Sequence, residues 1–95
     1  MIKIEDGILC CEHCGFNYLH QIKVDVFERS GEDSNKGLHV TTQGVMASIN
    51  TDMEGNPSSR RDGIKITFNC ENCDGLTYLY IIQHKGCTYI NPDWK

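Results

Sequence analysis

Several features are scarce or absent in this sequence, and each scarcity narrows the fold and the location. No apolar run approaches the ~20 residues that cross a bilayer, so we expect no membrane span. The first seven residues lack the long apolar core of a secretory signal, which favours the cytoplasm, where thiols stay reduced. No helical periodicity extends beyond one turn, so the pattern predicts an all-β chain.

Basic residues are too few for a typical nucleic-acid binder. The chain has 9 Lys and Arg against 13 Asp and Glu, and its formal net charge is -4. Proteins that bind nucleic acid mainly by neutralising phosphates are usually basic. The charge therefore favours a protein partner, with nucleic acid as the alternative if a local basic patch forms.

Length limits the size of the core. With 95 residues, the chain is predicted to be a single domain spanning residues 1–95. A domain of this size buries a modest core, and many such domains are stabilised by a metal ion or by disulfides. A source of stability besides hydrophobic packing is therefore expected.

Cysteine is abundant, and its spacing is informative. The six cysteines are Cys10, Cys11, Cys14, Cys70, Cys73 and Cys87. In a small secreted protein they would predict three disulfides, but four of them form two C-x-x-C pairs and no secretory signal is seen. Metal binding is the better interpretation of these four.

The two pairs, Cys11/Cys14 and Cys70/Cys73, form the candidate metal site. Four thiolates match the tetrahedral coordination of Zn²⁺, and two intervening residues let one tight turn direct both sulfurs at one ion. Gly15 follows the first pair, where a left-handed residue turns backbone N–H groups towards the sulfurs. Asp74 occupies the corresponding place after the second pair, and Asp tolerates that conformation better than most residues.

These cysteine knuckles and the extended segments beside them resemble a zinc ribbon. The resemblance covers roughly residues 8–19 and 64–90. One departure is the separation of Cys14 and Cys70 by 55 residues, against ~15–20 between the pairs of a compact ribbon. The intervening segment is strand-like, so we expect a zinc-ribbon-like antiparallel sheet with a long β insertion between the knuckles.

The wider pattern resembles short uncharacterised proteins of bacterial prophages and other mobile elements. That resemblance implies a bacterial origin and a zinc ribbon, and it supplies no activity. The matching stretches are the two knuckles, Gly37-Leu38-His39-Val40, Asn56-Pro57-Ser58-Ser59-Arg60-Arg61-Asp62-Gly63, and Gln83-His84-Lys85-Gly86 followed by Trp94.

Alternating apolar residues and turn signals predict the strands. Asp6-Gly7 marks a hairpin turn between short apolar runs, and a turn is expected again at residues 84–86. The predicted extended segments are residues 18–28, 38–49, 64–68, 76–82 and 87–90.

Two places along the chain leave the local structure open. The apolar residues between 38 and 49 change parity at Gly44, which a β-bulge explains and for which a tight turn at Gln43-Gly44 is the alternative. Residues 56–63 have the pattern of a one-turn helix capped by Asn56 and ended by Gly63, or of an irregular turn.

Arg60 and Arg61 are the candidate partner-binding residues, because a rigid loop would present both guanidinium groups to carboxylate or phosphate. Pairing with neighbouring acids is the other interpretation. A nucleic-acid-binding ribbon would need Lys65 and Lys85 to converge on the same loop. Tyrosines or Trp94 could stack on bases, but sheet packing is their commoner role.

We predict no catalytic residues and no enzymatic activity. The four histidines, His13, His20, His39 and His84, show no ligand spacing, and neither a Ser/His/Asp set nor paired carboxylates stand out. A rubredoxin-like iron centre or another metal-dependent redox role is the alternative for the cysteine pairs. Cys10 and Cys87 are expected to be buried or half-buried thiols outside the metal site.

Overall fold

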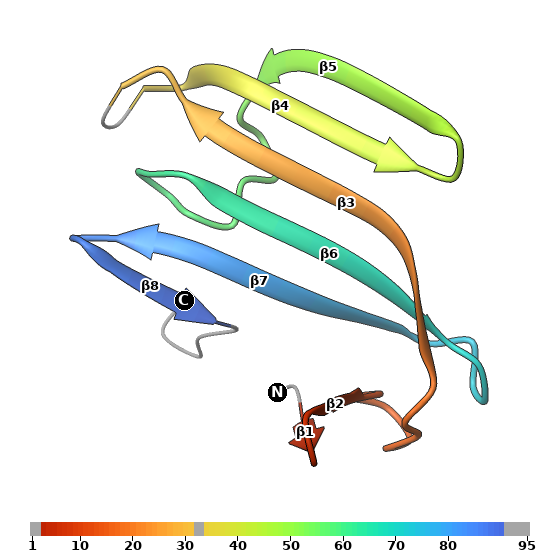
Figure 1. Cartoon of the computed structure of the whole chain (residues 1–95). Helices are drawn as coiled ribbons and strands as arrows, with labels where there is room; N and C mark the ends of the chain where they lie inside the picture. Colours follow the sequence, from red (N-terminus) through yellow and green to blue (C-terminus); the bar gives the residue numbers. More distant parts are fainter. Residues whose placement is uncertain (1–2, 32–33, 91–95) are drawn as a thin grey trace.

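The computed structural model describes residues 3–31 and 34–90, and Trp94 lies outside them. Within these residues the chain is all-β, as predicted (Figure 1). No helix that could cross a membrane is found among the described residues. The strands are β1 (Lys3–Glu5), β2 (Ile8–Cys10), β3 (Leu19–Arg29), β4 (Lys36–Gln43), β5 (Met46–Asp52), β6 (Gly63–Cys70), β7 (Leu76–His84) and β8 (Cys87–Ile90).

Six strands form one twisted antiparallel sheet, and β1 and β2 form a separate hairpin. The order across the large sheet is β5-β4-β3-β6-β7-β8, so β3 and β6 lie at its centre (Figure 1). The start of β3 and the end of β6 lie side by side next to the cysteine knuckles, because Leu19 pairs with Cys70. The segment between the knuckles adds strands to the sheet, which agrees with the predicted β insertion.

Tight turns occur where the sequence contains glycine after a polar residue. Asp6 and Gly7 have φ values of 52° and 79°, and Lys85 and Gly86 have 50° and 80°. Two consecutive positive φ angles are the signature of a type I′ turn, whose twist matches the strands it joins. Both turns confirm the sequence prediction.

The predicted bulge at Gly44 is wrong, and the alternative turn is correct. Gln43 pairs with Met46, so Gly44 and Val45 form a two-residue hairpin loop between β4 and β5. The register shifts instead on β3, between Gln21 and Lys23, and on β4, between Lys36 and His39. A two-residue loop reverses the parity of facing residues just as a bulge does, which explains why the pattern did not distinguish them.

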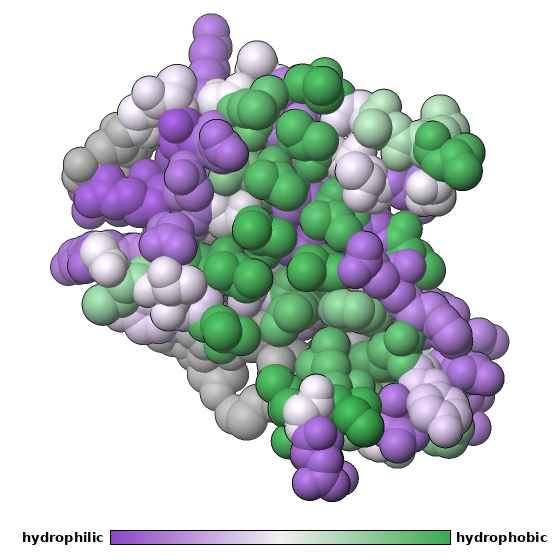
Figure 2. Space-filling model, viewed as in Figure 1, coloured by the Kyte–Doolittle hydropathy of each residue, from purple (hydrophilic) through white to green (hydrophobic). Residues whose placement is uncertain are grey.

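One face of the large sheet, here called the apolar face, is hydrophobic across all six strands. In the space-filling view an apolar band crosses the sheet and reaches the β1–β2 hairpin (Figure 2). The register places the following residues on this face: Val24, Val26, Leu38, Val40, Ala47, Ile49, Ile64, Ile66, Phe68, Leu79, Ile81 and Ile90.

The opposite face is polar along most of its length and is covered at one end by the loop of residues 53–62. Phe27 and Ile82 are buried there, together with Met53 and Pro57 from the loop. A Cβ on Gly63 would lie 2.5 Å from Asn56 Oδ1, so only glycine allows the loop to pack this closely.

The predicted helical turn at residues 56–63 is absent, and the segment is an irregular loop. Asn56 still acts as a cap, because its Oδ1 accepts the Ser58 N–H at 2.9 Å. The Arg61 N–H donates to Ser58 Oγ rather than to a main-chain oxygen. These side-chain contacts replace the helical hydrogen bonds.

Arg29 joins three segments at this end of the sheet. Its guanidinium donates to the Arg61 carbonyl at 2.9 Å, to the Ser58 carbonyl at 2.8 Å and to the Ser34 carbonyl. Its own N–H donates to Asp62 Oδ1 at 2.8 Å. One charged side chain thus holds the end of β3, the start of β4 and the covering loop together.

Candidate metal centre

The two cysteine knuckles have the same backbone hydrogen bonds. In the first, the Cys11 N–H donates to the Phe16 carbonyl at 2.8 Å, and the Gly15 N–H donates to the Cys11 carbonyl at 2.9 Å. In the second, the Cys70 N–H donates to the Gly75 carbonyl at 2.9 Å, and the Asp74 N–H donates to the Cys70 carbonyl at 3.2 Å. The knuckles are therefore two copies of one turn.

Both copies use a left-handed residue immediately after the second cysteine. Gly15 has φ 79° and Asp74 has φ 57°. The expectation that Asp74 would adopt the conformation of Gly15 is confirmed. Asp carries a Cβ that is strained in this region, so the second knuckle is built at a small local cost.

The four cysteine sulfurs of the two knuckles lie within 4.8 Å of one another. The Sγ atoms of Cys11 and Cys73 are 3.6 Å apart, as are those of Cys14 and Cys70. Four sulfurs about 2.3 Å from a central zinc ion would be about 3.8 Å apart. The cluster therefore has the size of a tetrahedral metal site and could hold a metal ion.

Backbone and side-chain N–H groups point at these sulfurs. The His13 N–H lies 3.3 Å from Cys11 Sγ, the Asn72 N–H lies 3.4 Å from Cys70 Sγ, and the Gly75 N–H lies 3.4 Å from Cys73 Sγ. The Asn72 side-chain amide is 3.6 Å from Cys14 Sγ. Such donors stabilise thiolate, which is the form that binds metal.

The thiols of the cluster differ in their acidity. Burial raises the pKa of Cys11, but N–H groups of Cys14 and His13 and the neighbouring thiols outweigh burial and lower it to about 6. The Asn72 amide and the Phe16 N–H lower the pKa of Cys14. The Gly75 N–H lowers the pKa of Cys73, but burial and the three neighbouring cysteines raise it to about 12. Four thiolates so close together need a cation among them.

Contacts that do not involve sulfur also hold the knuckles against each other. His13 Nε2 lies 2.8 Å from the Leu76 carbonyl, and the Glu12 N–H donates to Thr77 Oγ1 at 3.2 Å. A Cβ on Gly75 would be 2.7 Å from the His13 ring, so glycine is needed beside it. His13 is exposed, and its bridging contact was not foreseen from the sequence.

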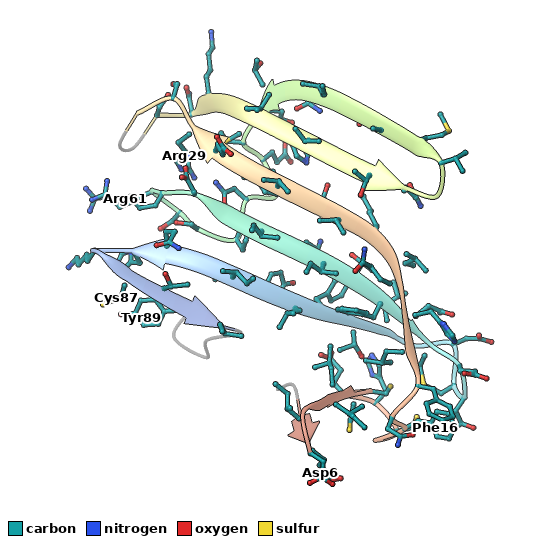
Figure 3. The ribbon with its side chains drawn as sticks, in the orientation of Figure 1. Asp6, Phe16, Arg29, Arg61, Cys87 and Tyr89 are labelled. Atoms are coloured by element: carbon teal, nitrogen blue, oxygen red, sulfur yellow. The ribbon has the colours of Figure 1, made fainter. Side chains whose placement is uncertain are left out.

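The two remaining cysteines have different environments. Cys10 is only 2% exposed, and its thiol donates to the Ile8 carbonyl at 3.6 Å, which confirms the predicted buried thiol. Cys87 is exposed, so the prediction of burial is wrong. It begins the edge strand β8, at the end of the sheet opposite to Phe16 of the first knuckle (Figure 3).

Arg60 and Arg61 lie on the covering loop. Arg61 is at the end of the sheet remote from the two cysteine knuckles (Figure 3). Arg60 is exposed and Arg61 is half-buried. Both border an open hollow of about 600 Å³ that also contacts Glu28 and Asp62. Lys65 does not extend this basic pair, because its ammonium lies 4.7 Å from the centre of the Tyr78 ring.

A cluster on the polar face contains Asp25, His39 and Thr41, which the sequence analysis did not connect. Asp25 Oδ1 accepts the Thr41 hydroxyl at 2.7 Å and lies 3.0 Å from His39 Nε2. That same nitrogen is 3.0 Å from Thr41 Oγ1. A hydrolytic triad uses the two different ring nitrogens for its acid and its nucleophile. We interpret this cluster as a structural hydrogen-bond network across β3 and β4.

Comparison with known proteins finds no match to this chain among protein-family models, curated proteins or solved structures. The resemblance to prophage proteins therefore rests on the sequence stretches named above. The geometry itself supports an all-β chain with a four-cysteine cluster that could bind a metal ion.

Proposed function

We propose that this chain is a small module in which zinc has a structural role and which binds a protein partner, acting as an adaptor. One observation carries the proposal: two equivalent knuckles direct four sulfurs into one cluster within 4.8 Å. Four protein ligands complete a tetrahedral zinc site and leave no position for a substrate. The ion would then supply folding energy rather than chemistry.

The donor set supports zinc over most other ions. Thiolate sulfur is a soft ligand that favours zinc and iron over the hard cations that oxygen ligands bind. Iron in a rubredoxin-like centre remains the alternative, and we propose zinc because Asp74 replaces the glycine that such centres usually carry after the second pair. The colour and the metal content of the purified protein separate the two.

Charge and loop structure support a protein partner. The net charge of -4 disfavours a partner held by phosphate contacts. The loop of residues 53–62 is held by Arg29 and by the hydrogen bond from Ser58 Oγ to the Gln83 carbonyl at 2.8 Å. A loop held on a rigid sheet is a common place for binding residues. We propose that Arg60 and Arg61 on this loop contact the partner.

The proposal extends to location and origin. We propose that the chain acts in the cytoplasm of a bacterium, in association with a prophage or another mobile element, and without enzymatic activity. The cysteine cluster needs reduced thiols to bind zinc, and the cytoplasm keeps thiols reduced, which supports the proposed location. The resemblance to short prophage proteins supports the proposed association with a mobile element.

A comparison of two variants tests the role of the loop. The Arg60→Ala/Arg61→Ala double variant is expected to lose a protein that the wild type captures from a bacterial lysate, while its metal content and thermal unfolding stay unchanged. Lys36→Ala, at the start of β4, serves as a control that loses one positive charge outside the loop. Capture that is unchanged in the double variant would contradict the role of the loop.

A mobility-shift assay tests the nucleic-acid alternative. We expect no binding to DNA or RNA at ~50 mM salt, where phosphate contacts are strongest. Binding that weakens steeply at ~200 mM salt would transfer the function to nucleic acid.

A further inference from the structure

The apolar face of the six-stranded sheet has no covering layer among the described residues. None of its twelve residues is fully buried, and Ile49 and Ile90 are 71% and 61% exposed. The same register adds three threonines and Gln83 to this face, and one acid, Glu28, opposite Leu38. The face is therefore mostly aliphatic, with few polar side chains. A sheet normally buries such a face against a second layer.

The interior of the described chain is too small to compensate for this exposure. Its fully buried hydrophobic residues are Phe27, Met53, Ile82 and three cysteines. Phe27, Met53 and Ile82 belong to the polar side of the sheet, under the covering loop. Most of the aliphatic side chains therefore lie on the uncovered face rather than in the interior.

We propose that a second copy of this chain packs face to face on the apolar face and forms a two-layer β-sandwich. Six strands about 4.8 Å apart and about five residues rising 3.3 Å each give roughly 450 Å² of flat area per copy. The pair would bury on the order of 900 Å² of flat surface, close to the ~1,000 Å² at which stable interfaces begin. The uneven surface of the side chains and the residues around the edge of the interface add to this area. The face is mostly aliphatic and carries one charge, Glu28 at its end, so its aliphatic part is complementary to itself.

The charges at the two ends of the sheet select the orientation of the second copy. The charged residues whose side chains are described around the knuckles and the hairpin are all acidic, namely Glu5, Asp6, Glu12, Glu71 and Asp74. The three arginines of the chain, Arg29, Arg60 and Arg61, lie at the other end, where they outnumber the acids Glu28 and Asp62 that line the hollow. Arg60 and Arg61 border the same hollow as Val26, Ile64 and Ile81 of the apolar face.

A parallel arrangement would place the two acidic ends together, which is unfavourable. An antiparallel arrangement separates them and sets each acidic end against the arginines of the other copy. The two copies are then related by a two-fold axis, and each contributes the same surface. This association does not depend on the adaptor partner proposed above.

The first test is the mass of the purified zinc-loaded chain in solution. Sedimentation equilibrium and light scattering are expected to give twice the chain mass of 10.8 kDa at ~100 µM. A monomer mass at that concentration would overturn the proposal. It would leave the metal site and the adaptor role untouched, because those are read from metal content and partner capture.

The second test compares two neighbours on β7 that point to opposite faces. Leu79 lies on the apolar face and Tyr80 on the polar face, and both are half-buried. Leu79→Glu buries a charge in the proposed interface and is expected to weaken dimerisation by about 100-fold or more. Tyr80→Glu is expected to remain a dimer. A dimer that tolerates Leu79→Glu overturns the proposal.

Two further variants cover the remaining outcomes. If Leu79→Glu fails to fold, Ile49→Glu on the exposed strand β5 replaces it, with Asn50→Glu on the opposite face as its control. Arg60→Glu/Arg61→Glu is expected to weaken the dimer about tenfold at low salt and little at ~1 M salt. Dimers that tolerate both Leu79→Glu and Ile49→Glu would show pairing through a sheet edge and contradict face-to-face packing.

Discussion

At both ends of the sheet, segments that are distant in the sequence are held together, but by different groups. At one end Arg29 donates to three main-chain carbonyls and closes the loops around β3. At the other end two knuckles meet through four sulfurs and a few hydrogen bonds, including the one between His13 and Leu76. The arginine end carries its cation in the sequence, whereas the cysteine end, on the proposed function, takes one from solution.

This difference predicts that stability at the two ends depends on different conditions. The arginine end needs only a folded chain, because guanidinium is charged at any ordinary pH. The cysteine end needs reduced thiols, deprotonated sulfur and a supply of metal. Removing the cation from either end should show which end the fold depends on more.

The largest effect is expected from the cysteine end. Cys70→Ser removes one of four ligands, and structural zinc contributes an apparent ~10–16 kcal/mol in small domains. We expect the variant to lose its metal and to unfold below room temperature, as measured by metal analysis and circular dichroism.

Two other cysteines provide controls for Cys70→Ser. Cys10→Ser places a hydroxyl in a buried position outside the cluster and should cost ~1–2 kcal/mol with metal retained. Cys87→Ser changes an exposed side chain and should be neutral. Full metal content in the Cys70→Ser protein would show that Cys70 is not a metal ligand.

The second largest effect is expected from the arginine end. Arg29→Ala removes the guanidinium donor from the Ser58 carbonyl and leaves the Arg61 carbonyl with the Asn56 side-chain amide as its donor. We expect it to cost about 3 kcal/mol in urea unfolding, with the metal still bound. Arg60→Ala, at an exposed position, should change stability by less than ~0.5 kcal/mol. Equal effects of both would contradict the role of Arg29.

A moderate, pH-dependent effect is expected from Asp25, between the two ends. Burial raises its pKa, but the Thr41 hydroxyl, His39 and Lys23 outweigh burial and lower it from 3.8. A carboxylate whose pKa is lower in the folded state stabilises the fold above the unfolded pKa, and this contribution is lost as pH falls through the folded pKa.

Asp25→Asn should therefore cost ~1–2 kcal/mol at pH 7 and progressively less below about pH 4. The quantity to measure is the difference between wild type and variant at each pH, because acid-driven loss of metal affects both proteins. A difference that grows as the pH falls would contradict the assignment.

The smallest effect is expected from the difference between the two knuckles. Asp74→Gly gives the second knuckle the left-handed glycine that the first has at position 15. Relief of the strained conformation should stabilise the protein by ~0.5–1 kcal/mol, measured by thermal unfolding of the zinc-loaded form. Destabilisation would show that the Asp74 side chain has a role beyond the turn.

Local signals in the sequence predicted much of the cysteine end. The C-x-x-C pairs, the left-handed residue after each pair and the Asp6-Gly7 turn depend on neighbouring residues alone. The predicted strands also appear, because period-two alternation survives in β6 and over most of β3. The bulge near Ile22 was missed, because an extra residue in a strand can be recognised only when the pairing with the neighbouring strand is known.

The arginine end could not be predicted in the same way. Arg29 contacts the carbonyls of residues 34, 58 and 61, and a carbonyl carries no signature in the sequence. The pairing of β3 with β6 depends on the whole sheet, so the meeting of Asp25 with His39 was also hidden. The burial expected of Cys87 was wrong because β8 is an edge strand.

The most direct test of this account is the metal content of protein purified without added metal, followed by chelation. We predict one colourless zinc ion per chain and cooperative unfolding when a strong chelator removes it. A red iron-containing protein would shift the function to electron transfer. A metal-free protein that stays folded under reducing conditions would contradict the claim that the cysteine end depends on a bound cation.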